Sequence, residues 1–122
     1  MIGKSANAKT TVSETNTAKA VGSGDLDVFS TPMMIALMEE AACNALAEAL
    51  KPGQSSVGTQ ISVEHTAASA LGTEITATAT ITSVEGQKVT FDLQASDSNQ
   101  EIGKGTHSRF IIDKERFLSK LQ

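Results

Sequence analysis

Two adjacent carboxylates, Glu39 and Glu40, lie within an otherwise apolar segment that runs from Phe29 to Leu50. Burying a carboxylate is costly unless it is paired or neutralised, so its place in such a segment needs an explanation. Either the segment shows one polar edge to solvent, or a carboxylate is kept in a sheltered site where it acts as a nucleophile or as a general base. The arrangement of the segment as a helix decides which carboxylate is the better candidate.

The apolar segment carries the signals of a helix with defined ends. Ser30 or Thr31 can act as the N-cap, and Pro32 fits the first helical position, where its missing N–H costs nothing. A Lys-Pro-Gly sequence at positions 51–53 supplies a stop. At about 100° per residue, one face of this helix carries Met34, Leu37, Met38, Ala41, Ala45 and Ala49.

The same projection separates the two carboxylates. Glu39 falls on the flank of the apolar face beside side chains such as Leu46, whereas Glu40 points further round toward Asn44. We therefore predict that Glu39 is sheltered and that Glu40 is solvated. Cys43 lies in mid-helix among small apolar residues and is predicted to be a packed thiol.

The remainder of the chain is predicted to form strands around this helix. Four segments after it show the period-2 alternation of half-buried strands. In the first of them, Val57, Thr59 and Ile61 are predicted to share one face, with Gly58 and Gln60 on the other. The expected elements are short strands at 10–13 and 18–21, longer strands at 57–65, 75–81, 89–95 and 102–112, and a closing helix at 113–121.

This order of elements predicts a single α+β domain over residues 1–122, in which a curved antiparallel sheet wraps around one long central helix. One sheet can cover only one face of such a helix. The uncovered small apolar residues and the exposed sheet edge favour a homodimer, and dimers could pair further into a tetramer.

The composition excludes several classes of function. The net charge of −4, without a basic run, and the absence of Trp and Tyr argue against a nucleic-acid binding surface. The one cysteine allows neither an intramolecular disulfide nor a cysteine metal cluster, and no metal site is predicted. No stretch approaches the roughly 18 apolar residues of a membrane span, and the N-terminus lacks an apolar secretory core, so a cytoplasmic protein is expected.

Four motifs in order carry a resemblance to a known family: STP-x6-EEAA on the helix, then SVGTQISVEHTAAS, SVEGQKVTFDLQASD and EIGKGTHSRFII. The set resembles the hot-dog acyl-CoA thioesterases, and most closely the branch typified by fluoroacetyl-CoA thioesterase. The similarity runs from about Phe29 to Ile112. VGT-x5-HTAA together with GTH-x-RF is specific as a combination, although each piece alone is weak.

The resemblance implies a hot-dog fold, hydrolysis of acyl-CoA thioesters, and sites at the interface of a homodimer. It implies no cofactor, since coenzyme A is part of the substrate. The catalytic Thr, Glu and His of the family match Thr31, Glu39 and His65, while its active-site Gly and the Arg of its GTH-x-R motif match Gly58 and Arg109. The helix projection selects Glu39 independently of this match.

These residues suit the chemistry that the resemblance implies. Glu39 either attacks the thioester carbonyl or acts as a base toward water, with His65 as its helper and Thr31 near the developing oxyanion. Thr31 and Glu39 are eight residues apart, so a regular helix separates them by about 12 Å along its axis. A shared site therefore needs a substrate that bridges them or contact across a dimer.

Other residues have two readings each. Thr31 could be only the N-cap, Gly58 could only permit close backbone approach, and Arg109 could pair with a carboxylate or meet the phosphates of CoA. His107, on the last strand, is expected to be structural or to form an interface. Met33, Met34 and Met38 are core or acyl-pocket residues.

The segment before the helix predicts a different substrate from that of the branch. In fluoroacetyl-CoA thioesterase this segment carries phenylalanines that form a lid over the acyl group. The corresponding GSGDLDVF stretch offers only Phe29, which with Met34 is expected to contact the acyl group. We expect another short or medium acyl group, or a broad range.

Two alternatives belong to other classes of function. One is a hot-dog hydratase or dehydratase, although the Asp-x4-His arrangement of one such branch is missing. The other is a non-catalytic acyl-CoA binding module, which would keep the pocket and tolerate replacement of Glu39.

Overall fold

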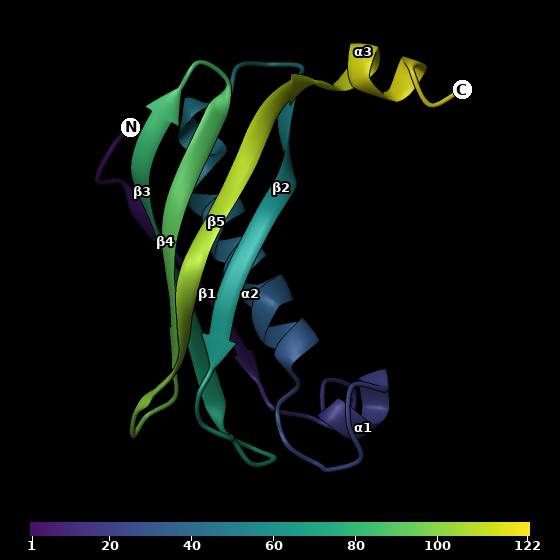
Figure 1. Ribbon diagram of the computed structural model, residues 1–122, viewed down its shortest axis with the longest axis vertical. Coiled ribbons are helices and arrows are strands. Elements are labelled where there is room, and N and C mark those ends of the chain that lie inside the picture. The colour runs from purple at the N-terminus through teal and green to yellow at the C-terminus, as the bar shows by residue number, and fades with distance from the viewer.

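The computed structural model describes all 122 residues of the chain. A long helix lies across one face of a five-stranded antiparallel sheet (Figure 1). In chain order the elements are β1 (Ser5–Thr11), α1 (Ala18–Val21), α2 (Thr31–Leu46), a 3-10 turn (Ala47–Ala49), β2 (Gln54–His65), β3 (Glu74–Glu85), β4 (Lys88–Ser96), β5 (Glu101–Asp113) and α3 (Lys114–Ser119). The order of strands across the sheet is β1-β3-β4-β5-β2.

The core lies between α2 and the inner face of the sheet. Small side chains on β3 and β4, such as Ala77, Ala79 and Ala95, are fully buried and let the helix come close. On β5, a Cβ on Gly103 would lie 2.6 Å from the sulfur of Met34. The helix packs mainly against β1 and β3 and makes few contacts with β2. Strand β2 is also the one strand of the sheet that has no buried residue.

The fold confirms the predicted α+β class and the curved sheet around one central helix. The four predicted strands after the helix and the short closing helix are also present, with slightly different ends. The prediction of a strand at Ala18–Val21 is wrong, because this segment is helical. The hydroxyl of Thr17 caps it by accepting from the amide of Ala20, and Gly22, with a φ of 79°, ends it.

The prediction that Cys43 is packed is wrong for the single chain, in which this residue is exposed. The sheet covers only one side of α2, and Cys43 lies outside that side. The buried residues of the helix are Met34, Leu37, Met38, Ala41, Ala42, Ala45 and Leu46.

Strand β2 departs from simple alternation. Its pairing with β5 shifts register between Gly58 and Gln60, which leaves Thr59 as the extra residue of a β-bulge. The predicted shared face of Val57, Thr59 and Ile61 is therefore wrong. Because of the bulge, Gly58 and Ile61 both face inward, and a Cβ on Gly58 would meet Glu39.

One end of the molecule extends beyond the sheet. The helix α3 follows β5 and projects past the edge formed by β2 (Figure 1), and it leaves Leu118 56% exposed. None of the helices combines the length and the hydrophobicity that a transmembrane span requires.

Candidate functional site

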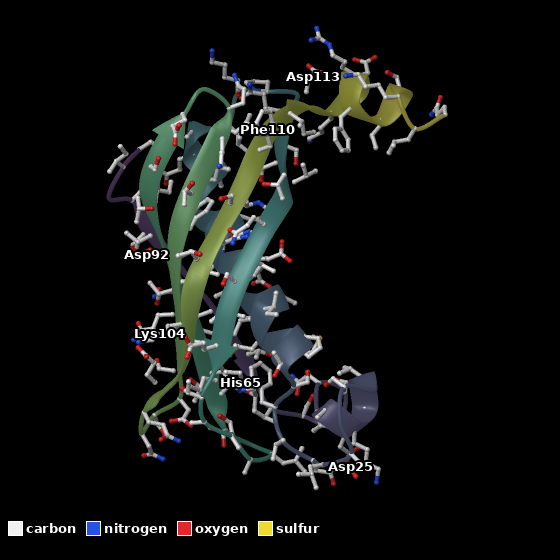
Figure 2. The ribbon with its side chains drawn as sticks, viewed as in Figure 1. Asp25, His65, Asp92, Lys104, Phe110 and Asp113 are labelled. Carbon is white, nitrogen blue, oxygen red and sulfur yellow. The ribbon has the colours of Figure 1, made fainter.

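The first cluster joins the start of α2 to the end of β2. The hydroxyl of Ser30 accepts from the amide of Met33 at 3.2 Å, so Ser30 is the N-cap and the side chain of Thr31 is free for another partner. That partner is His65, whose Nδ1 lies 2.8 Å from Oγ1 of Thr31. His65 lies at the lower end of β2 in Figure 2. A hydroxyl and an imidazole in contact form a possible nucleophile and base, or a proton relay.

His65 is poised as a neutral imidazole. Burial lowers its pKa from the ordinary 6.5, and a backbone hydrogen bond to Ala67 opposes this shift. Its Nε2 is buried and has no hydrogen-bond partner within the chain. A buried polar atom without a hydrogen-bond partner lowers the stability of the fold, so its presence needs an explanation, and a catalytic role is one.

A hollow of about 280 Å³ adjoins the Thr31–His65 pair. Phe29 is 2% exposed and lies in its wall rather than over it as a lid, and the preceding 22–27 loop is exposed. The other residues that line this hollow are mostly small: Ala18, Ser23, Val28, Thr66, Ala67 and Ala68.

The second cluster centres on Glu39, midway along α2. Its Oε2 accepts from Nη1 of Arg109 at 3.0 Å and lies 3.7 Å from Nε2 of His107. The Arg109 side chain is 8% exposed and that of Glu39 is 40% exposed. The adjacent Glu40 is exposed and has no ion pair, so the predicted difference between the two carboxylates is confirmed.

The bulge in β2 shapes the space around this carboxylate. A Cβ on Gly58 would lie 2.6 Å from Oε2 of Glu39, which is too close for any other residue without displacement. A hollow of about 290 Å³ opens here and is lined by Glu39, Gly58, Thr59, Gln60, Ile61 and His107. The side chain of Ile61 faces inward opposite His107, yet Ile61 is 38% exposed because α2 does not cover this strand.

The two clusters lie apart within one chain. The expected set of Thr31, Glu39 and His65 is split, since two turns of α2 or about 12 Å separate Thr31 from Glu39. Gly58 and Arg109 belong with Glu39, whereas Phe29 belongs with His65. Met34 is fully buried against Gly103 and lies in the core.

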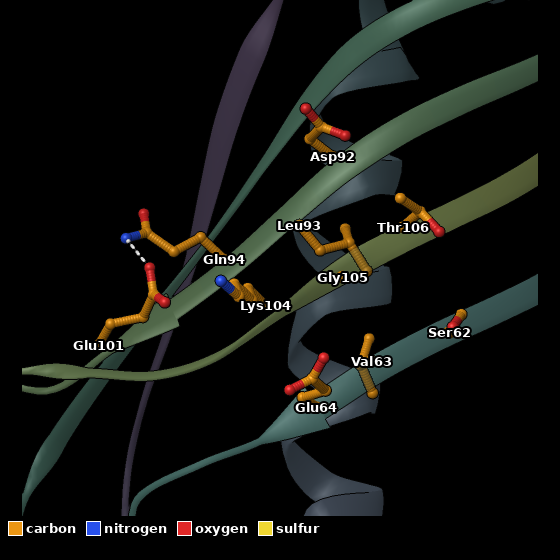
Figure 3. A pocket seen from close by; sticks show the side chains of 10 residues that line it. All are labelled: Ser62, Val63, Glu64, Asp92, Leu93, Gln94, Glu101, Lys104, Gly105 and Thr106. Carbon is orange, nitrogen blue, oxygen red and sulfur yellow. Dashed lines mark hydrogen bonds between the residues drawn. The ribbon is translucent and has the colours of Figure 1, made fainter.

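A third and larger hollow, of about 500 Å³, lies over β2, β4 and β5 on the other face of the sheet (Figure 3). Its lining is polar, and a hydrogen bond from Gln94 to Glu101 spans 2.9 Å at one side. None of the expected site residues lines it. No group of three or more His, Cys, Asp or Glu side chains is placed to hold a metal ion.

Two contributors to the site were missed from sequence. Nε of Arg109 donates to the hydroxyl of Ser56 at 2.9 Å, and Nη2 of Arg109 donates to the carbonyl of the same serine at 3.1 Å. The carbonyl of Gln60 contacts Nδ1 of His107 at 2.7 Å. The role of Ser56 has one signal in the sequence, which is a serine directly before the VGT motif. The role of the Gln60 carbonyl has none, because every residue has a backbone carbonyl.

A long helix packed on one face of a curved antiparallel sheet, with a carboxylate on the helix facing a glycine of the edge strand, is the arrangement of a protein of the hot-dog fold. Residues 12–115 match the family described as "Fluoroacetyl-CoA-specific thioesterase", FlK. The chain belongs to this family and is a thioesterase. Family membership favours thioester hydrolysis over the hydratase and binding-module alternatives.

Individual relatives agree with this assignment. The chain is 45% identical over 96 residues to the fluoroacetyl-CoA thioesterase of Streptantibioticus cattleyicolor, which covers 79% of the chain and 69% of the relative. A solved structure of the fluoroacetyl-CoA thioesterase FlK superposes with a TM-score of 0.92 at 36% identity, over 99% of this chain and 94% of that one. A hot-dog-like protein from Thermanaerovibrio acidaminovorans gives a TM-score of 0.89 at 26% identity, over 98% and 89%.

Proposed function

We propose that the protein hydrolyses an acyl-CoA thioester to the free acid and CoA, with Glu39 as the principal catalytic residue. The observation that carries this proposal is the state of the Glu39 carboxylate. Arg109 holds Oε2, no hydrogen bond within the chain engages Oε1, and the group borders a hollow. Solved structures of the relative FlK include complexes with fluoroacetate and CoA and with acetyl-CoA, which supports CoA esters as the class of substrate.

Two routes through Glu39 are chemically consistent. In the first, a carboxylate oxygen attacks the thioester carbonyl, the C–S bond breaks, and an acyl anhydride and a CoA thiolate form; water then hydrolyses the anhydride. In the second, Glu39 takes a proton from a water molecule that attacks the carbonyl directly. In both routes neutral His65 acts as a relay: it takes the proton released by the reacting water, in the hydrolysis of the anhydride or in the direct attack, and passes it to the CoA thiolate. The hydroxyl of Thr31 donates to the developing oxyanion.

The separation of the two clusters supports a site shared by two copies of the chain. One side of β2 is unpaired, and the same edge carries the exposed Ile61. Two copies related by a twofold axis perpendicular to this edge would pair their β2 strands antiparallel, which turns the His65 end of one copy toward the Gly58 region of the other. Thr31 and His65 of one copy would then complete the Glu39 cluster of its partner.

The acyl group is proposed to be short or medium in length. The hollow beside Thr31 and His65 has a wall of alanines and Phe29 and a volume of about 280 Å³. The preceding 22–27 loop brings no aromatic lid, so selectivity for a fluorinated acyl group is not expected. The cytoplasmic location stays a prediction from the sequence.

The test is thiol release from a panel of acyl-CoA esters, from short to long and aryl. Wild type should cleave a preferred ester, and Glu39→Gln should lose about 10³-fold or more in kcat. Glu40→Gln is the matched control because it makes the same change on the adjacent exposed residue, and it should keep wild-type rates. Equal rates for Glu39→Gln and wild type would refute the assignment.

Hydroxylamine in the assay distinguishes the two routes. Attack of hydroxylamine on the glutamyl carbonyl of an anhydride would release the acyl group as its carboxylate and leave a hydroxamate on Glu39, which mass spectrometry of the peptide detects. Direct attack by water leaves the residue unmodified.

A further inference from the structure

His107 is fully enclosed on β5 and takes no part in the reaction steps above. It is 1% exposed, and its ring stacks on Phe91 of β4 with centroids 5.8 Å apart and an interplanar angle of 29°. A buried imidazole must satisfy both of its nitrogens or lose stability. The partners of these nitrogens therefore reveal what the residue does.

The two partners fix the tautomer of His107. Nδ1 lies 2.7 Å from the carbonyl of Gln60, which can only accept, so Nδ1 carries the hydrogen and donates it. Nε2 lies 3.2 Å from Nη1 of Arg109, and a guanidinium can only donate. Nε2 is therefore an unprotonated acceptor, and His107 is the neutral Nδ1–H form.

The environment of His107 favours this neutral form. Burial lowers its pKa from the ordinary 6.5, the Gln60 carbonyl opposes that shift, the charge of Arg109 adds to it, and the charge of Glu39 opposes it. The charged groups that face the ring are Arg109 on β5 and Glu39 on α2. From β2 it meets the backbone of Gln60, and from β4 the ring of Phe91.

The nitrogen of Arg109 that binds His107 is the one that binds Glu39. Nη1 has two N–H groups, and its two acceptors are Oε2 of Glu39 at 3.0 Å and Nε2 of His107 at 3.2 Å. Nε and Nη2 are used by Ser56. The guanidinium is thus held on three sides and cannot turn away from the carboxylate without breaking a buried hydrogen bond.

The anchor of this chain of hydrogen bonds is the bulge itself. Gln60 is the residue at which the β2–β5 register resumes, and Gly58, just before the shift, gives Glu39 its room. The same local distortion of β2 therefore sets both the space for the carboxylate and, through His107 and Arg109, its orientation.

We propose that His107 is a positioning residue: its imidazole, anchored on the Gln60 carbonyl, holds Nη1 of Arg109 so that Glu39 is fixed by Oε2 and presents Oε1 to the substrate. This role rests on the catalytic role proposed above for Glu39. It differs from a packing role because it requires the acceptor at Nε2, and ring volume alone does not supply it.

Three variants separate positioning from packing. His107→Gln can place an amide oxygen near the position of Nε2 and so keep an acceptor for Arg109. His107→Asn is shorter and keeps only a donor for the Gln60 carbonyl. Phe91→Leu removes the ring that stacks on His107 and leaves the hydrogen bonds intact, so it controls for lost packing.

For His107→Asn we expect kcat to fall by about 10–100-fold, which is the typical loss when a residue that orients another functional side chain is replaced. KM should stay within about twofold of the wild-type value. His107→Gln should recover most of this loss, and Phe91→Leu should lower Tm while kcat stays near the wild-type value. The proposal would be overturned if His107→Asn, His107→Gln and Phe91→Leu all lost kcat to the same extent.

A second readout does not depend on activity. Arg109 and Arg116 are the only arginines, so their guanidinium signals in ¹⁵N NMR are easily told apart. Wild type and His107→Gln should show resolved signals for the Nη hydrogens of Arg109. In His107→Asn these signals should be averaged by rotation of the guanidinium, as the signals of the exposed Arg116 should be in all three proteins. An ordered Arg109 in His107→Asn would overturn the positioning role even if no thioester were cleaved, and averaging there would support it independently of the substrate.

Discussion

The two histidines of this chain occupy contrasting sites. His65 contacts a single side-chain hydroxyl, has a buried nitrogen without a partner, and lies beside a hollow. His107 has both nitrogens engaged and a ring stacked on Phe91. Burial lowers the pKa of both, so the pKa alone does not distinguish them.

The difference shows how hydrogen bonding assigns roles to equal side chains. An imidazole with an unused nitrogen can exchange a proton with a substrate, whereas one with both nitrogens engaged can only hold its neighbours in place. Replacements at His65 should therefore affect the chemical step directly, and replacements around His107 should act through the geometry of Glu39.

The largest effect in this comparison is expected at His65. His65→Asn removes the proton donor and acceptor and should lower kcat by about 10³-fold, with little change in Tm because the ring is only partly enclosed. Steady-state kinetics and thermal unfolding measure the two effects. If His65→Asn lowered Tm but kept the wild-type kcat per folded molecule, His65 would have a structural role like that of a packed histidine.

Gly58→Ala tests the geometry of the second cluster without removing any functional group. The added methyl would lie 2.6 Å from Oε2 of Glu39 and force the carboxylate to move. A displacement of about 1 Å can cost about 10²-fold in rate, so kcat should fall by that order. Gly86→Ala in the hairpin turn is a control for the backbone, and it should affect stability through its φ of 62° but not kcat per folded molecule.

A smaller effect is expected at Thr31, since Ser30 already caps the helix. Thr31→Val keeps the shape and removes the hydroxyl that contacts His65, and kcat should fall by about tenfold. Thr31→Ser should recover most of the activity. Thr106→Val on the outer face of the sheet is the matched control, and it should leave kcat unchanged.

The smallest effect is on the pH dependence of stability. The pKa of each histidine is lower in the folded chain than the ordinary 6.5, so the unfolded chain binds more protons below that pH. The free energy of unfolding should therefore fall as the pH drops through about 6.5. Tm measured from about pH 7.5 to about pH 5.5 should decline less in the His65→Asn/His107→Asn double variant than in wild type; an equal decline would contradict the shifts.

The sequence was sufficient for the fold and for the choice between the carboxylates. Helical spacing separates the half-exposed Glu39 from the exposed Glu40, and period-2 alternation locates the four strands after the helix. Both signals depend on which side chains are apolar, and this is recorded directly in the sequence.

The parts that were missed depend on backbone contacts and on small shifts. Alternation cannot reveal a bulge, so it placed Gly58 and Ile61 on opposite faces of β2, whereas both face inward. The carbonyl of Gln60 binds His107 whatever its own side chain is, and burial of Cys43 was overestimated because the sheet covers only one side of α2. The 18–21 segment is helical because Thr17 and Gly22 cap it.

The open edge of β2 links catalysis to concentration. A strand of 12 residues with one free side offers unpaired amides and carbonyls to any extended chain, and a second copy is the partner that also completes the proposed site. Dilution below the dissociation constant of such a dimer would leave each copy with only half of its catalytic groups. Specific activity should then fall at low protein concentration, and each separated copy would carry an edge prone to aggregation.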